Sequence, residues 1–254
     1  MSEYDFFDAN CAFGMPMNGA PEIAPVAAAL LAEMDRVGVK HALAGAVNAP
    51  VSGAEAANQW LAAQLDEEQS GRLSGVWSFL PDCCGEFPSG KKLVSGMKKH
   101  RIRALRLLPA AHRWVCRRAS VGRQFAELAE HRIPLLAGVS EFGSWDKIYE
   151  LAETFPDNVF IVTDCGVWGC DRQVRPLLTE FEHVHFALGD YWNAGGLADL
   201  VKHAGHCKIL FGSGYPRCNH GQSMLMVRHA EITETAKRAI AGGNLEHLLG
   251  EVKW

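Results

Sequence analysis

Three polar side chains on separate predicted strands could carry out chemistry together. Asp164 and Asn10 each end a short apolar run, and Arg106 lies inside another. A carboxylate beside a guanidinium and an amide can work without a metal, because the carboxylate accepts a proton from water while the other two groups hold an anionic or carbonyl oxygen. We therefore predict Asp164, Arg106 and Asn10 as catalytic residues, provided that the fold brings them together.

The elements that would position these residues alternate along the chain. Short β-branched or apolar runs are separated by longer stretches of helical periodicity, which is typical of βα units that build a parallel sheet. The predicted strands are Phe6–Asn10, His41–Ala46, Leu73–Leu80, Ala104–Leu108, Pro134–Gly138, Val159–Asp164, Val184–Gly189 and Lys208–Ser213. The predicted helices are Ile23–Val37, Ala54–Leu65, Lys91–Lys99, Val121–Glu130, Trp145–Phe155, Gln173–Glu182, Leu197–Ala204 and Gln222–His229, and a last helix pair follows. We predict an α/β fold of the (β/α)8 TIM-barrel type.

The length supports this fold, because the 254 residues match the roughly 250 residues typical of one such barrel. We expect a single domain over residues 1–254. An open doubly wound sheet is the alternative, and a phosphate-binding glycine fingerprint would favour it. The segment Gly14–Gly19, which follows the first strand, contains a proline and does not read G-x-G-x-x-G.

Two helix boundaries and one strand can be predicted in more detail. Gly38 ends the first helix without a Cβ penalty, and Ser144 caps the helix that begins at Trp145. Strand alternation places Asp8, Asn10 and Ala12 on one side of the first strand and Cys11 on the other. In a closed parallel barrel, inward side chains at the C-terminal strand ends meet at one mouth, where such enzymes place their sites.

Motifs at both ends of the chain are similar to those of a known family. Ile209–Pro216, which reads I-L-F-G-S-G-Y-P, resembles the eighth-strand motif of the amidohydrolase-related barrels, apolar-apolar-F-G-[ST]-D-x-P. Ile232–Gly250 resembles the closing helices of that family with their G-G-N-x-x-x-L-L ending, and Phe7–Gly14 resembles its first-strand motif D-x-H-x-H. The resemblance implies a (β/α)8 barrel of the metal-dependent hydrolase type.

The metal ligands implied by this resemblance are mostly replaced. The family holds a divalent cation with two histidines on strand one, one histidine on each of strands five and six, and an aspartate on strand eight, and the cation activates water. The corresponding positions here are Asn10, Ala12, Ala137 or Gly138, Asp164 and Gly214. Only Asp164 keeps a ligand side chain, and a lone carboxylate does not make a tight transition-metal site. We therefore expect neither a metal nor another cofactor.

The resemblance also implies that Asn10 and Asp164 face the position of the metal, where Arg106 can join them if it points inward. A salt bridge between Asp164 and Arg106 that only fills this space is the structural alternative. Further residues near the predicted mouth are candidates for contacts with the substrate. They are His112, Trp77, Asp190, Ser213, Tyr215 and His220.

Other nucleophilic or metal sites are weaker alternatives. Gly138–Phe142 approaches the nucleophile elbow G-x-S-x-G around Ser140, but phenylalanine takes the second glycine position. Cys165 follows Asp164, and alternation directs it away from the mouth, which favours a buried structural thiol. Cys165, Cys170, Cys218 and His220 supply soft zinc ligands, although their spacings match no common structural zinc motif.

Composition excludes several classes of protein. The hydrophobic fraction of 48% supports a full core, and no apolar run approaches membrane-spanning length. The 8 cysteines include an adjacent pair, so we expect free thiols and a cytoplasmic protein. A net charge of −4 points to neither nucleic acid nor membrane, although residues 88–126 contain only basic charges. This segment is either a solvated face or a patch that attracts anions.

The sequence thus leaves two main functions open. One is a hydrolase, or a related lyase, that needs no metal and acts on a small carboxylated or carbonyl substrate. The other is a catalytically silent barrel that binds a small anionic ligand or a protein partner. Nucleic-acid binding is weaker because no recognisable fold for it is present. A homodimer is expected on general grounds, since many soluble enzymes form one.

Overall fold

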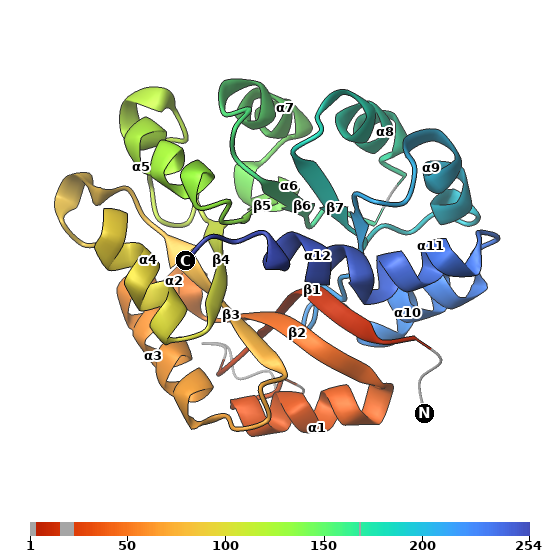
Figure 1. Ribbon diagram of the computed structural model, residues 1–254, viewed down its shortest axis with the longest axis horizontal. Coiled ribbons are helices and arrows are strands. Elements are labelled where there is room, and N and C mark those ends of the chain that lie inside the picture. The colour runs from red at the N-terminus through yellow and green to blue at the C-terminus, as the bar shows by residue number, and fades with distance from the viewer. Residues whose placement is uncertain (1–3, 16–22, 168) are drawn as a thin grey trace.

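The computed structural model describes residues 4–15, 23–167 and 169–254, and it confirms the predicted barrel. Eight parallel strands follow one another around the sheet in chain order, and helices surround them (Figure 1). The strands are β1 Phe6–Phe13, β2 Val39–Ala46, β3 Leu73–Phe79, β4 Ile102–Leu107, β5 Leu135–Gly138, β6 Phe160–Thr163, β7 Val184–Ala187 and β8 Ile209–Leu210. The sheet closes where Ala9 N–H donates to Phe211 C=O at 2.9 Å and Gly214 N–H donates to Asn10 C=O at 2.9 Å.

The outer layer contains the predicted helices and several short ones that the periodicity did not reveal. The helices are α1 Ala27–Val37, α2 Ala49–Ser52, α3 Ala54–Glu67, α4 Gly90–Lys99, α5 Arg118–Glu130, α6 Val139–Phe142, α7 Trp145–Thr154, α8 Asp171–Glu180, α9 Gly196–Ala204, α10 His220–His229, α11 Glu234–Arg238 and α12 Asn244–Gly250. A 3-10 turn covers Asp82–Cys84, and a π-helical turn, Ala239–Gly243, joins α11 to α12. The short helices α2 and α6 lie in loops directly after strands, so they help to shape the mouth.

Both predicted helix boundaries are confirmed. Gly38 has a φ of 87° and donates its N–H to Met34 C=O at 2.8 Å, and the Ser144 side chain accepts a hydrogen bond from Lys147 N–H. The predicted start of the first helix at Ile23 is wrong, because α1 begins at Ala27. Pro25 disfavours helical geometry at the residue before it, which explains the later start. Most of the segment Gly14–Gly19 lies outside the described residues.

An extra residue in β1 breaks the alternation that the sequence predicted. Asp8 pairs with Ala42 and Cys11 with Ala44, so β1 advances by one residue more than β2. Because of this β-bulge, the Asp8 and Asn10 side chains point to different sides of the strand. The prediction that they share one side is therefore wrong. Asp8 contacts Ser213, whereas Asn10 contacts Arg106 inside the barrel.

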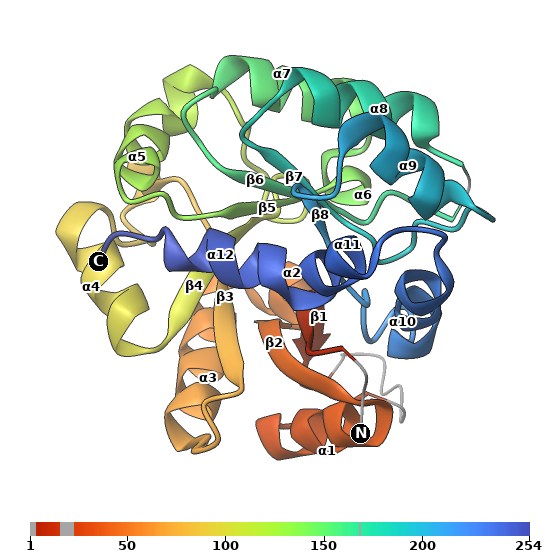
Figure 2. The same cartoon turned by 45° about the vertical axis from the view of Figure 1, so that its right-hand side comes forward.

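The N-terminal end of the barrel is closed by α12. Leu245, Leu248 and Leu249 of this helix pack in one buried cluster with inward residues of the strands, such as Ala9 and Ile161. Figures 1 and 2 show α12 lying across the barrel. Because this end is plugged, the C-terminal mouth is the end at which strand-tip side chains can meet a ligand.

No helix in the described part of the chain is long and apolar enough to cross a membrane. Each of the cysteines lies among the described residues and is a free thiol.

Candidate active site at the barrel mouth

A cavity of about 260 Å³ opens at the C-terminal mouth. Part of its lining is apolar and includes Val76, Leu108 and Pro216. The polar part of the lining comes from six strands or the loops that follow them. It consists of Asn10, Ser78, Arg106, Glu141, Asp164, Tyr215 and Arg217. The three predicted catalytic residues therefore line one cavity.

Arg106 of β4 is the centre of the polar part of this lining. Its Nη1 donates to Asn10 Oδ1 at 3.0 Å, its Nη2 to Asp164 Oδ2 at 2.5 Å, and its Nε to Glu141 Oε1 at 3.0 Å. The side chain is only 17% exposed. Burial opposes the positive charge, but Glu141 and Asp164 outweigh it and raise the pKa of Arg106. A fixed cation is thus held at the mouth.

Asp164 follows β6 in a left-handed backbone conformation with a φ of 54°, which Asp tolerates better than most residues. Its carboxylate accepts hydrogen bonds from Asn10 Nδ2 at 3.2 Å and from Thr163 Oγ1 at 2.9 Å, besides those from Arg106 and Arg217. Burial alone would raise the pKa of Asp164, but Arg106 and Arg217 outweigh it and lower that pKa. Asp164 is therefore held in its ionised form.

Glu141 is a site residue that the sequence did not single out. It lies in α6, directly after β5, and its side chain reaches the mouth because Gly138 leaves room for it. A Cβ added at Gly138 would stand 2.8 Å from Glu141 Oε2 and 2.9 Å from Asp164 Oδ2. Burial raises the pKa of Glu141, and Arg106 does not fully offset this effect. Two carboxyl groups therefore border the space that one glycine leaves open.

Arg217, in the loop after β8, is the second site residue that the sequence did not single out. It donates from Nη2 to Asp164 Oδ1 and from Nη1 to Asp190 Oδ2, the latter at 2.9 Å. Its side chain is 51% exposed, so it lies at the rim of the mouth. Asp190 also accepts hydrogen bonds from the backbone N–H groups of Cys165 and Gly166.

The predicted substrate contacts are only partly brought to this cavity. Tyr215 lines it, and Asp190 reaches it through Arg217. His112 lies outside the lining, with Nε2 hydrogen bonded to the Ala49 carbonyl at 2.9 Å. Trp77 faces the outer helical layer, where Gly96 of α4 packs close to its ring. The structure therefore does not bring Trp77 to the mouth.

Ser213 and His220 lie behind the mouth, between β1, the end of β8 and α10. Ser213 Oγ donates to Asp8 Oδ2 at 2.5 Å, and His220 Nε2 lies 3.6 Å from the same oxygen. The His220 ring stacks on Tyr215 with a centroid distance of 4.8 Å. Both side chains are fully buried, so they support Tyr215 and do not face the cavity.

The structure also locates the residues of the weaker alternatives. Ser140 is exposed, and it is the next residue, Glu141, that lines the mouth. Cys165 is buried, and a hydrogen bond with Cys170 together with burial raises the pKa of its thiol, which disfavours a reactive thiolate.

The donor set at the mouth does not fit a divalent cation. Of the five positions where the family resemblance implies ligands, the one with an acidic side chain is Asp164. Donor groups already contact both oxygens of this carboxylate. Arg106 reaches into the same space with a positive charge. Within residues 4–15, 23–167 and 169–254, no group of three or more His, Cys, Asp or Glu side chains could hold a metal ion.

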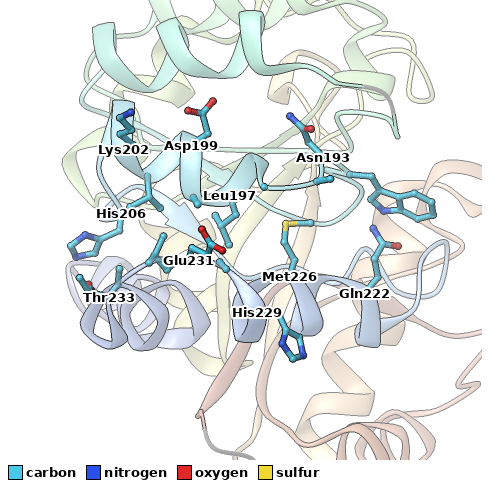
Figure 3. Close-up of a pocket in the computed structure, with 18 residues that line it drawn as sticks. Asn193, Leu197, Asp199, Lys202, His206, Gln222, Met226, His229, Glu231 and Thr233 are labelled. Carbon is cyan, nitrogen blue, oxygen red and sulfur yellow. Dashed lines mark hydrogen bonds between the residues drawn. The ribbon is translucent and has the colours of Figure 1, made fainter.

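A larger cavity, of about 1120 Å³, lies elsewhere, between α9 and α10 in the outer layer. Figure 3 shows Leu197 of α9 and Met226 of α10 among its walls. Its walls are mainly apolar, and of its acidic residues Asp199 is paired with Arg175 while Glu231 is exposed. We place the candidate active site at the smaller cavity, because that is where acid, base and cation converge.

Comparisons with known proteins now define the class. The amidohydrolase family model matches residues 14–250, so the chain belongs to the amidohydrolase family. No curated protein matches the chain.

Several solved structures share the fold at low sequence identity. The 2,6-dihydroxybenzoate decarboxylase from Rhizobium is 12% identical with a TM-score of 0.72, and the match covers 97% of this chain and 99% of that one. A dihydroxybenzoic acid decarboxylase from Polaromonas, solved with bound manganese, is 13% identical with a TM-score of 0.69 and 97% coverage of both chains. A Pseudomonas putida protein proposed to be a 2-pyrone-4,6-dicarboxylic acid hydrolase is 14% identical with a TM-score of 0.68, covering 98% of this chain and 99% of that one. At these identities the similarity establishes the fold alone.

Proposed function

We propose that this amidohydrolase-family barrel is a hydrolase that acts on a small carbonyl or carboxylated compound at its C-terminal mouth and works without a metal. The observation that carries the proposal is the contact of one guanidinium, Arg106, with both Asn10 and Asp164. These are two of the positions at which the family resemblance implies metal ligands. Arg106 thus supplies a positive charge in the space where related proteins would use a cation.

The chemistry follows from these groups. Arg106 and the Asn10 amide are donors that can stabilise the oxygen of a carbonyl group as it gains negative charge. Asp164 is ionised and can accept a proton from an attacking water. Arg217 at the rim is placed to meet a carboxylate on the substrate. The apolar wall takes the remainder of a small molecule.

The choice of test substrates follows from the cavity and the structural neighbours. Esters, lactones and amides offer a carbonyl group for hydrolysis, and a pyrone dicarboxylic acid is a lactone that also carries carboxylates. Carboxylated aromatics test the related lyase reaction, decarboxylation, which two of the neighbours carry in their names. A cytoplasmic location and a homodimer belong to the same proposal and stay predictions.

The experiment combines elemental analysis with a substrate screen. Protein treated with a chelator should contain less than one equivalent of zinc, manganese or iron and should keep its activity. Asp164→Asn should lower kcat by about 10²–10⁴-fold, the range for loss of a general acid or base. The matched control is Asp157→Asn, at an exposed position in a loop. A full metal equivalent whose removal abolishes turnover would overturn the proposal.

A catalytically silent binding protein is the second candidate, and one observation favours it. Asp164 already accepts hydrogen bonds from Asn10, Thr163 and both arginines, as expected for a salt bridge that fills the site. This function predicts no turnover in the screen and a rise of the melting temperature with a small carboxylate. Binding that is unchanged in Arg106→Ala would remove Arg106 from the binding site.

A further inference from the structure

The second oxygen of Glu141 has no hydrogen-bond partner in the part of the chain that the structure describes, although it is shielded from solvent. The first oxygen accepts from Arg106 Nε at 3.0 Å. A buried carboxylate oxygen without a donor costs free energy, because it loses its water and gains nothing in return. The same oxygen as a hydroxyl group could instead donate a hydrogen bond.

A second carboxylate borders the same small space. Glu141 Oε2 and Asp164 Oδ2 stand 2.8 and 2.9 Å from the same point, the position of a Cβ that Gly138 lacks. Two negative charges that border one buried space repel each other, and a proton on one of the two carboxyl groups removes this repulsion. The absence of a side chain at Gly138 is what leaves this space open.

The charges around the pair also favour one proton. The ion-paired groups at the mouth are Arg106 and Arg217 on the positive side and Glu141, Asp164 and Asp190 on the negative side. With all of them ionised, the carboxylates outnumber the guanidinium groups. One proton on a carboxyl group balances the set.

We infer that Glu141 and Asp164 form an acid–base pair in which Glu141 carries the proton and delivers it to the leaving group. This inference rests on the proposed function and adds a catalytic residue to it. The directions of the pKa shifts agree, since burial raises the pKa of Glu141 while the two arginines lower that of Asp164. When the surroundings raise the pKa of one carboxyl group and lower that of another, the first is suited to act as the acid and the second as the base.

The reaction balances without another reactant. Water gives a proton to Asp164 and its oxygen bonds to the carbonyl carbon, while the carbonyl electrons move to the oxygen held by Arg106 and Asn10. The bond to the leaving oxygen or nitrogen then breaks, and that atom takes the proton of Glu141. The proton on Asp164 then returns to Glu141, which restores the starting state.

The first test needs no substrate. Infrared difference spectra at neutral pH should contain the carbonyl band of a protonated carboxyl group, and Glu141→Gln should remove this band. Asp164→Asn should shift the titration of the band to lower pH, because it removes the negative charge that favours the proton. Glu153→Gln, at an exposed position on α7, is the matched control and should keep the band. A wild-type protein without the band would overturn the inference.

The second test uses the substrate found in the screen. Glu141→Gln should lower kcat by about 10²–10⁴-fold with little change in KM. In the wild type, kcat/KM should fall as the pH rises through the pKa of Glu141, and the variant should lose this fall. Full activity in Glu141→Gln would overturn the role of Glu141 and leave the hydrolase assignment standing. A screen without turnover would instead count against the hydrolase, while the infrared result still decides the protonation state.

Gly138→Ala separates the pair from the single residues. The backbone at Gly138 has a φ of −78°, which alanine adopts without strain. The added Cβ would push the two oxygens apart, and a displacement of about 1 Å can cost about 10²-fold in rate. We expect such a loss together with a weaker infrared band. An unchanged rate and band in Gly138→Ala would contradict the acid–base pair.

Discussion

Replacing Arg106 by methionine should destabilise the fold strongly. The change removes the donors to Asn10, Glu141 and Asp164 but keeps most of the buried volume of the side chain. Loss of one partner from a buried ion pair costs about 3–5 kcal/mol in free energy of unfolding. The lower end, about 3 kcal/mol, applies here because Arg217 still pairs with Asp164 and because Glu141, which we infer to be protonated already, leaves no negative charge unpaired. For a chain of this size that corresponds to a fall in Tm of about 6–12 °C.

The assay is urea unfolding at neutral pH, followed by circular dichroism. Arg123→Met is the matched control, because Arg123 is 66% exposed in its pair with Asp82. Exposed pairs contribute about 0–1 kcal/mol, so the control should stay close to the wild type. In the double variant Arg106→Met/Asp164→Asn, the loss in free energy of unfolding should be smaller than the sum of the two single losses by about 0.5–3 kcal/mol, because the groups interact directly. A loss below about 1 kcal/mol in Arg106→Met would refute the view that this cation holds the mouth together.

Three further predictions concern stability. Gly242→Ala should cost about 1–3 kcal/mol, because its Cβ would stand 2.4 Å from the Asp5 carbonyl oxygen, whereas Gly250→Ala meets nothing within 4 Å; equal unfolding midpoints would contradict this. The raised pKa of Glu141 favours its protonated form in the fold, so the wild type should lose stability as the pH rises through that pKa. The glutamine of Glu141→Gln cannot ionise, so the stability of this variant should increase relative to the wild type over the same rise in pH. Parallel stability curves for the two proteins would contradict this prediction. Burial lowers the pKa of His185 to about 4, so stability should fall as the pH drops from about 6.5 towards that value, and His185→Phe should remove this slope in acid-unfolding curves.

The strand pattern could be read from the sequence because it depends on local properties. Apolar runs such as Leu135–Gly138 and Phe160–Thr163 are buried on both faces of a parallel sheet and stand out against the helical periodicity between them. The start of α1 was missed because the restriction imposed by Pro25 outweighs the apolar spacing around it. The short helix α6 has too few residues to show a period.

The site could be predicted only in part. Asp164, Arg106 and Asn10 were found because strand ends in a barrel converge, and the structure brings all three to one cavity. Asn10 reaches it because of a bulge in β1 that alternation does not reveal. Arg217 and Glu141 lie in loops, whose side-chain directions depend on turns and contacts far along the chain.

The amino-acid sequence by itself determined the barrel and its family, because residue type and spacing carry that information. The tertiary structure decided which charged groups meet at the mouth. Glu141 and Asp164 border the same space because β5 and β6 are neighbours and because Gly138 has no side chain, and Arg217 donates to the Asp164 carboxylate from the loop after β8. Distances between groups far apart in the chain are set by the closure of the barrel, and with them the protonation states on which any reaction here depends.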